Sequence, residues 1–287
     1  MEKLDRLGWA AGLRFVSHGV RIGIRVNEPG ALERVGAHLP PHWKPSASPI
    51  VDELCSLLVG GNTRGSGIRR YNLLYWGAGR VARTMDNDEV FHALEELLHV
   101  VVSTGARRRV FVRAAAVAWR GKALIICGPS ASGKTALVEA LVRAGATFYS
   151  ERYVVLDARG RVHPYPGPLV FRDGAEEKVR KCSVESLGGR VAKKPLPVGL
   201  VLETQYRRGT RFRPRVLSTG QALLALLRET VQARLRPGFA LATCRRVAGS
   251  ALTLRGKRGE AEDTVTPLFD HLCNAGHDGR LLLSSPA

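Results

Sequence analysis

Residues 128–135 read Gly-Pro-Ser-Ala-Ser-Gly-Lys-Thr, which is the spacing G-x-x-x-x-G-K-T of a phosphate-binding loop. A short apolar run at residues 123–127 precedes the loop and is typical of a buried strand. Residues 136–143 follow with helical spacing and end before Ala144-Gly145, a usual signal for the end of a helix. Strand, glycine-rich loop and helix in this order are the context that the motif requires. The sequence therefore predicts a loop that binds the phosphates of a nucleoside triphosphate.

Each residue type in this loop has a physical task. Glycines let backbone N–H groups turn toward a polyphosphate, and the start of the following helix adds partial positive charge. Lys134 is expected to reach the β- and γ-phosphates, and the Thr135 hydroxyl is expected to bind Mg²⁺. ATP and Mg²⁺ are thus the predicted ligands. The predicted nucleotide-binding residues are Gly128, Pro129, Ser130, Ala131, Ser132, Gly133, Lys134 and Thr135.

The composition is that of an ordinary globular protein. At 287 residues the chain is long enough for one large domain or two smaller ones. No apolar run approaches the roughly 18 residues of a membrane-spanning helix. The first residues also lack the charged-then-apolar layout of a signal peptide. We therefore expect a cytoplasmic protein without a membrane partner.

Cysteine and histidine spacing argues against a dedicated metal cage. The five cysteines lie far apart, and no pair has the C-x-x-C spacing of a zinc knuckle or of a redox motif. The eight histidines are equally scattered, and none joins a cysteine or carboxylate at metal-ligand spacing. The metal that the sequence does predict is Mg²⁺ bound mainly by nucleotide phosphates.

The formal net charge of +19 attracts any polyanion, including nucleic acid, an acidic peptide or ATP itself. Most of the 44 basic residues are arginines, and they occur in scattered clusters. No zinc finger, helix-turn-helix or aromatic RNA-binding motif accompanies them. Binding of nucleic acid beyond non-specific attraction is therefore not expected.

Two regions are expected along the chain. Residues 1–105 read as a small α+β region, with a strand at 19–26, a short helix at 30–39 and a hairpin at 72–83. Residues 86–89 are acidic and are expected to cap a helix that runs to about residue 102. A glycine-rich loop is expected at 60–67.

Residues 106–287 are expected to form the nucleotide-binding domain. Strands outnumber helices around the loop and hairpin turns connect them, so we expect a mixed sheet within an α/β fold. The expected strands lie at 110–112, 114–119, 123–127, 146–150, 153–157, 196–202 and 250–255, and the expected later helices lie at 221–233 and 260–273.

Residues 113–172 resemble the P-loop module of the HPr kinase/phosphorylase family and its HPr-kinase-like relatives, which include kinases from peptide natural-product clusters. The resemblance rests on residues 114–119, 121–135, 143–151 and 153–166. It implies a kinase-type mixed sheet with ATP and Mg²⁺ across one end, and transfer of a phosphoryl group to a hydroxyl of a protein, peptide or small molecule. Because HPr kinases proper form oligomers, the resemblance also allows a homo-oligomer.

Three positions depart from the family's pattern. The family has a histidine where this chain has Arg113, and two adjacent acids where this chain has Glu151-Arg152. In the family the first acid serves Mg²⁺ and the substrate hydroxyl, so the resemblance implies that Glu151 is the catalytic residue and a metal ligand. The alternative is a non-catalytic nucleotide sensor that has lost the kinase acids. A second alternative is a basic, nucleic-acid-associated NTPase.

Other polar residues near the motif have simpler interpretations. Residues 153–157 imitate a strand whose final Asp157 would hold Mg²⁺ through water, but Asp157 also begins an Asp-Ala-Arg-Gly turn, which we favour. His163 is expected to be structural, and Glu203 is expected to be a salt-bridge partner.

Overall fold

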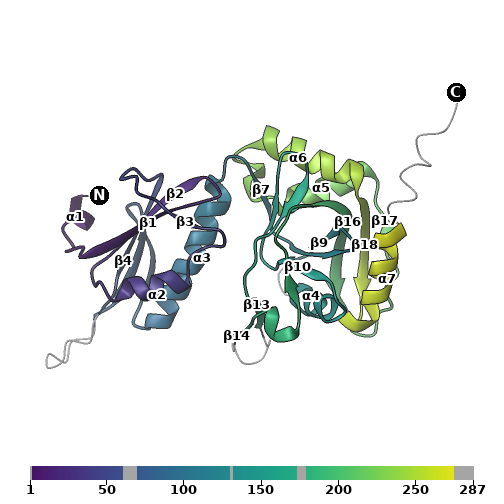
Figure 1. Ribbon diagram of the computed structural model, residues 1–287, viewed down its shortest axis with the longest axis horizontal. Coiled ribbons are helices and arrows are strands. Elements are labelled where there is room, and N and C mark those ends of the chain that lie inside the picture. Colours follow the sequence, from purple (N-terminus) through teal and green to yellow (C-terminus); the bar gives the residue numbers. More distant parts are fainter. Residues whose placement is uncertain (1, 61–69, 130–131, 173–178, 275–287) are drawn as a thin grey trace. The chain divides into compact units, whose positions relative to one another are not determined.

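The computed structural model describes residues 2–60, 70–129, 132–172 and 179–274 (Figure 1). The chain divides into two compact units, Met1–Arg108 and Arg109–Ala287. Within the described residues, none of the helices combines the length and the apolar character that a membrane span requires.

The first unit is a six-stranded sheet with helices packed on it. Its strands follow the order β3-β1-β2-β4-β5-β6, and β2 and β4 are parallel while the other neighbours are antiparallel. The predicted hairpin and both predicted helices are confirmed, whereas α1, β1, β3 and β4 were not predicted. The elements are α1 (Glu2–Asp5), β1 (Ala11–Ser17), β2 (Val20–Val26), α2 (Ala31–Ala37), β3 (Lys44–Pro45), β4 (Glu53–Leu58), β5 (Asn72–Trp76), β6 (Gly79–Thr84) and α3 (Asn87–Gly105).

Helix α3 illustrates how local sequence determines this unit. The Asp86 side chain accepts hydrogen bonds from the backbone N–H groups of Asp88 and Glu89, which satisfies donors that the first turn leaves unpaired. Val90, Leu94 and Leu98 recur every four residues and are fully buried. The predicted glycine-rich loop at 60–67 lies almost wholly outside the described residues.

The second unit is a larger mixed sheet, in agreement with the sequence prediction. Its main path follows the order β15-β10-β8-β9-β16-β12-β11-β7, and β18 pairs with both β16 and β17. The strands of this sheet are β7 (Val110–Val112), β8 (Ala115–Trp119), β9 (Lys122–Cys127), β10 (Thr147–Ser150), β11 (Val154–Leu156), β12 (Arg161–His163), β15 (Arg190–Val191), β16 (Leu196–Tyr206), β17 (Arg215–Val216) and β18 (Leu252–Arg258); a separate hairpin contains β13 (Leu169–Arg172) and β14 (Val179–Cys182).

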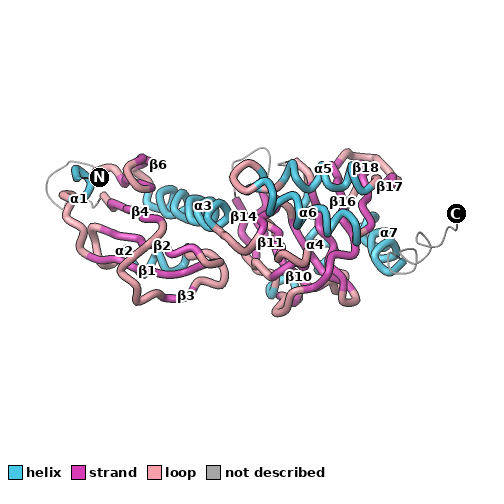
Figure 2. The backbone as a smooth tube through the Cα atoms, turned by 90° about the horizontal axis from the view of Figure 1, so that it is seen from above, coloured by secondary structure: helices cyan, strands magenta, loops and turns pink. Residues whose placement is uncertain are grey.

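Helices cover both faces of this sheet (Figures 1 and 2). Residues alternate along β9, so that Leu124 and Ile126 join the core beneath α4 (Lys134–Arg143) and α7 (Ala261–Asn274). Ala123 and Ile125 join the opposite core, beneath α5 (Thr219–Glu229) and α6 (Pro237–Ser250). A strand buried on both faces explains why residues 123–127 form a continuous apolar run.

Strand directions bring four carboxyl ends to one edge of the sheet. Strands β9, β16 and β18 are parallel to one another. Strand β10 is antiparallel to β8, which is antiparallel to β9, so β10 also runs in the direction of β9. We call this edge, where β10, β9, β16 and β18 end, the carboxyl edge. In open α/β sheets, ligands bind at the carboxyl ends of the parallel strands.

Several elements in the second unit differ from the sequence prediction. The helix expected at 221–233 ends at Glu229, because Thr230 has an extended backbone with ψ of 120°, and residues 231–233 form a separate 3₁₀ turn. Strand β16 extends to Tyr206 because β18 pairs with it as far as Arg258. Helix α6 was not predicted; it begins at Pro237, and proline is well tolerated at the start of a helix.

Candidate functional site

The phosphate-binding loop joins the carboxyl end of β9 to the start of α4. Gly133 has a φ of +78°, which strongly favours glycine. A Cβ atom on Gly128 would lie 2.4 Å from the carbonyl oxygen of Thr204, so this position has no room for a side chain. The Ser132 carbonyl accepts a hydrogen bond from the Tyr206 N–H at 3.1 Å, which ties the loop to the end of β16. The predicted loop residues Ser130 and Ala131 lie outside the described residues.

Lys134 folds back over the loop. Its ammonium group donates to the carbonyl oxygens of Gly128 at 2.9 Å and Pro129 at 2.7 Å. Burial lowers the pKa of Lys134, and the carboxylates of Glu151 and Glu229 act against this shift. The side chain therefore places a partly desolvated cation at the loop, where its attraction to phosphate is stronger than in bulk water.

Thr135 and Glu151, the two residues predicted to bind Mg²⁺, are in direct contact. The Thr135 hydroxyl donates to Glu151 Oε1 at 2.9 Å. Thr135 lies in the first turn of α4, and Glu151 directly follows β10 at the carboxyl edge. Hydroxyl and carboxylate oxygens are ligands that Mg²⁺ accepts, and Mg²⁺ commonly takes its other ligands from phosphates and water. The residues present thus fit this metal.

Among the residues that the structure describes, no group of three or more histidine, cysteine or acidic side chains is placed to hold a metal ion.

The positions that depart from the family pattern lie at the same edge. Arg113 follows Val112, which pairs with Val154 at the start of β11, and it lies two residues before Ala115, which pairs with Ile126 near the carboxyl end of β9. Arg113 is exposed, and its backbone N–H donates to the carbonyl oxygen of Glu229 at 2.8 Å. Glu151 and Arg152 are each partly buried.

Glu229 is a second acid at this edge, and it was not predicted as a site residue. It is the last residue of α5, and its carboxylate acts on the pKa of both Lys134 and Cys127. Cys127 is the last residue of β9, directly before the loop. Glu229 belongs to no sequence motif. Its place near the loop depends on how α5 packs against β9, which the sequence pattern does not reveal.

Arg258 is a second residue that sequence reasoning missed. The sequence places it in a basic cluster, yet the side chain is only 1% exposed. It donates from one terminal nitrogen to the carbonyl oxygen of Gly133, and from the other to that of Gly259 at 2.9 Å. Burial lowers the pKa of Arg258, while the nearby Glu260, Tyr206 and Glu262 raise it. A buried guanidinium thus braces the last turn of the phosphate-binding loop.

Asp157 has the turn role that the sequence favoured. Its carboxylate accepts from the backbone N–H groups of Arg159 at 2.9 Å and Arg161 at 3.0 Å, and from the Arg161 side chain at 2.9 Å. His163 Nε2 lies 3.0 Å from the same carboxylate. Burial alone would raise the pKa of Asp157, but the hydrogen bonds from His163, Arg161 and Arg159 lower it to about 2. A carboxylate that is satisfied in this way stabilises its turn.

Glu203 also has the predicted role. Its carboxylate accepts from the Arg255 side chain at 2.7 and 2.9 Å, and an Arg228 nitrogen lies 3.6 Å away. Glu203 is therefore a salt-bridge partner within the second unit.

Comparison with known proteins gives a distant structural likeness. No family model matches this chain, and no curated protein matches it. A solved structure of the HPr(Ser) kinase/phosphatase from Coxiella burnetii is similar, with a TM-score of 0.37 and 11% sequence identity. The match covers 59% of this chain and 98% of that chain. At this level the two proteins share at most a distant relationship of fold.

Proposed function

We propose that this chain binds ATP with Mg²⁺ and transfers a phosphoryl group to a hydroxyl of a protein, peptide or small molecule. The observation that carries the proposal is the 2.9 Å contact between Thr135 and Glu151, directly beside Lys134 and the glycine-rich loop. It brings together a phosphate cradle, a hydroxyl ligand and a carboxylate, all at the edge of the sheet where ligands bind.

Most of the catalysis that this site would perform is positioning and charge neutralisation, since phosphoryl transfer requires little covalent help from the protein. Lys134 and the loop N–H groups would hold the phosphates, and Arg258 would keep the Gly133 turn in place. Bound Mg²⁺ would neutralise charge on the phosphates. Glu151 would orient the acceptor hydroxyl and accept its proton as the phosphoryl group transfers.

The second candidate is a nucleotide sensor without catalysis. Two arginines favour it. Arg113, which is exposed and lies beside the strand that follows Arg152, stands where the family resemblance implies a histidine. Arg152 stands where it implies a second acid. A displacement of about 1 Å at a reacting centre can reduce the rate on the order of a hundredfold. The phosphate-binding part of the site would be the same in both candidates.

Turnover of ATP distinguishes the two candidates. We expect the full chain to release phosphate slowly from ATP with water as a substitute acceptor, and to do so only when Mg²⁺ is present. Release of γ-labelled phosphate, followed over hours and compared with a sample lacking Mg²⁺, measures this directly. Saturable ATP binding without any turnover or transfer would favour the sensor, and absence of ATP binding would contradict both candidates.

A further inference from the structure

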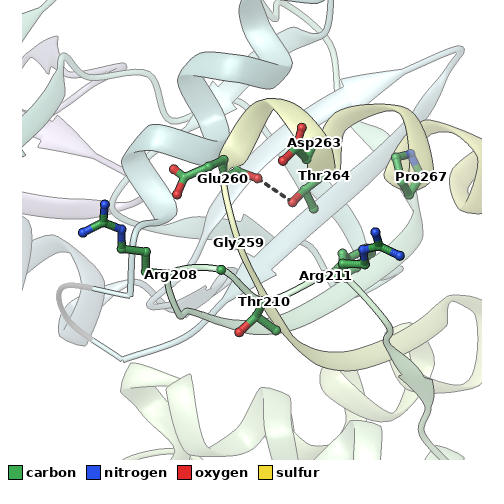
Figure 3. Close-up of a pocket in the computed structure, with 10 residues that line it drawn as sticks. Arg208, Thr210, Arg211, Gly259, Glu260, Asp263, Thr264 and Pro267 are labelled. Carbon is green, nitrogen blue, oxygen red and sulfur yellow. Dashed lines mark hydrogen bonds between the residues drawn. The ribbon is translucent and has the colours of Figure 1, made fainter.

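A pocket at the carboxyl edge lies next to the phosphate-binding loop. None of the predicted site residues that the structure describes lines this pocket. Its volume is about 630 Å³, which is within the range of about 300–1,000 Å³ for small-molecule sites. Figure 3 shows two segments that line it. One segment follows β16 and contributes Arg208, Thr210 and Phe212; the other follows β18 and contributes Gly259, Glu260 and Asp263.

Two residues connect this pocket directly to the loop. The Tyr206 N–H donates to the carbonyl oxygen of Ser132, and the Tyr206 hydroxyl donates to the Glu260 carboxylate at 3.0 Å. Arg258 donates to the carbonyl oxygens of both Gly133 and Gly259. The phosphate-binding loop and the pocket wall therefore share hydrogen bonds and are held as one structure.

The pocket and Glu151 lie on opposite sides of the loop. Along the sheet the strands follow the order β10-β8-β9-β16, and β18 pairs with the carboxyl-terminal half of β16. Glu151 follows β10, the loop follows β9, and the pocket segments follow β16 and β18. A nucleoside triphosphate whose γ-phosphate lies toward Thr135 and Glu151 therefore has its nucleoside end toward the pocket.

We propose that this pocket binds the nucleoside of the triphosphate, with Asp263 accepting a hydrogen bond from a ribose hydroxyl. The proposal rests on the proposed function, because the phosphates must lie on the loop. Acidic side chains bind ribose hydroxyls in other nucleotide sites. Glu260 already accepts from Tyr206, which leaves Asp263, in the first turn of α7, as the carboxylate for the ligand.

The remaining lining suits a base. Phe212 and Pro267 supply apolar surface, and arginines such as Arg208 stack on planar groups. Glycine lets the two segments approach closely, since a Cβ atom on Gly259 would lie 2.4 Å from the carbonyl oxygen of Thr210. Arg208 and Arg211 balance the charges of Glu260 and Asp263 in the lining, so the pocket has no formal net charge that would attract an additional phosphate.

Comparing ATP with inorganic tripolyphosphate separates the pocket from the loop, because tripolyphosphate has the phosphates without the nucleoside. We expect Asp263→Ala to weaken ATP binding about tenfold, as for the loss of one hydrogen bond to a charged group. Tripolyphosphate should bind this variant as tightly as it binds the wild type, or slightly more tightly. Calorimetric titration with each ligand in Mg²⁺ provides the measurement, and retained tripolyphosphate binding also shows that the variant is folded.

Asp270→Ala is the matched control, because Asp270 is exposed on the same helix and does not line the pocket. This control should bind both ligands as the wild type does. Equal weakening of both ligands by Asp263→Ala, or no change in either, would overturn the pocket proposal alone. Failure of the wild type to bind either ligand would overturn the proposed function as well.

Discussion

Replacing Glu151 with glutamine is expected to lower the rate of phosphoryl transfer about 100- to 10,000-fold, the range for loss of a positioned general base. Glutamine keeps the size of the side chain and can still accept the hydrogen bond from Thr135. It has no negative charge and cannot take the acceptor's proton. ATP affinity should stay nearly unchanged, because Lys134 and the loop provide most of the contacts to the phosphates. Release of labelled phosphate, measured together with ATP affinity, tests both parts.

The matched control for this prediction is Glu185→Gln, since Glu185 is an exposed glutamate in a 3₁₀ turn of the same unit. The control should turn over ATP at the wild-type rate. Brisk transfer by Glu151→Gln would remove the role that we assign to Glu151. Glu229 would then be the next acid to substitute, because it also acts electrostatically on Lys134.

Replacing Lys134 with alanine is expected to weaken ATP binding about ten- to a hundredfold. Hydrogen bonds to charged groups contribute roughly 1.5–3 kcal/mol, and each 1.4 kcal/mol corresponds to a factor of about ten in affinity. The partial burial of Lys134 favours the upper part of this range, because its charge is less screened by solvent. Calorimetric titration of ATP in the presence of Mg²⁺ measures the change.

Lys193→Ala serves as the control for the loss of one positive charge, because Lys193 is exposed and lies outside the loop. The net charge of +19 attracts ATP in general, so this control should show only a small, salt-dependent loss. If Lys134→Ala and Lys193→Ala weaken ATP equally, the binding arises from the general charge of the protein and not from the loop.

The parts of the fold that were predicted from sequence depend on local physics. Gly128 and Gly133 sit where a side chain or an ordinary backbone conformation would not fit, so the motif itself predicts the loop. The Asp86 cap and the apolar spacing after it predict α3 for the same reason. Thr135 and Glu151 were paired through the family resemblance, and the structure brings them into contact.

The residues that the sequence did not reveal are placed by long-range pairing. Arg258 reaches Gly133 because β18 pairs with β16 all the way to Tyr206, which a pattern of alternating residues cannot show. Glu229 comes to the site through the packing of α5, and the pocket beside the loop needs two segments that are far apart in the sequence. These features depend on contacts between elements, which local propensity does not specify.

Hydrogen exchange of the full chain, with and without saturating ATP and Mg²⁺, tests most directly whether the nucleotide lies along the carboxyl edge. Bound ligand slows exchange where it stabilises the backbone. We expect slower exchange in peptides that contain the loop and the start of α4, the segment after β16 and the start of α7, with Met1–Arg108 unchanged. Unchanged exchange across residues 128–135, or protection confined to Met1–Arg108, would contradict it.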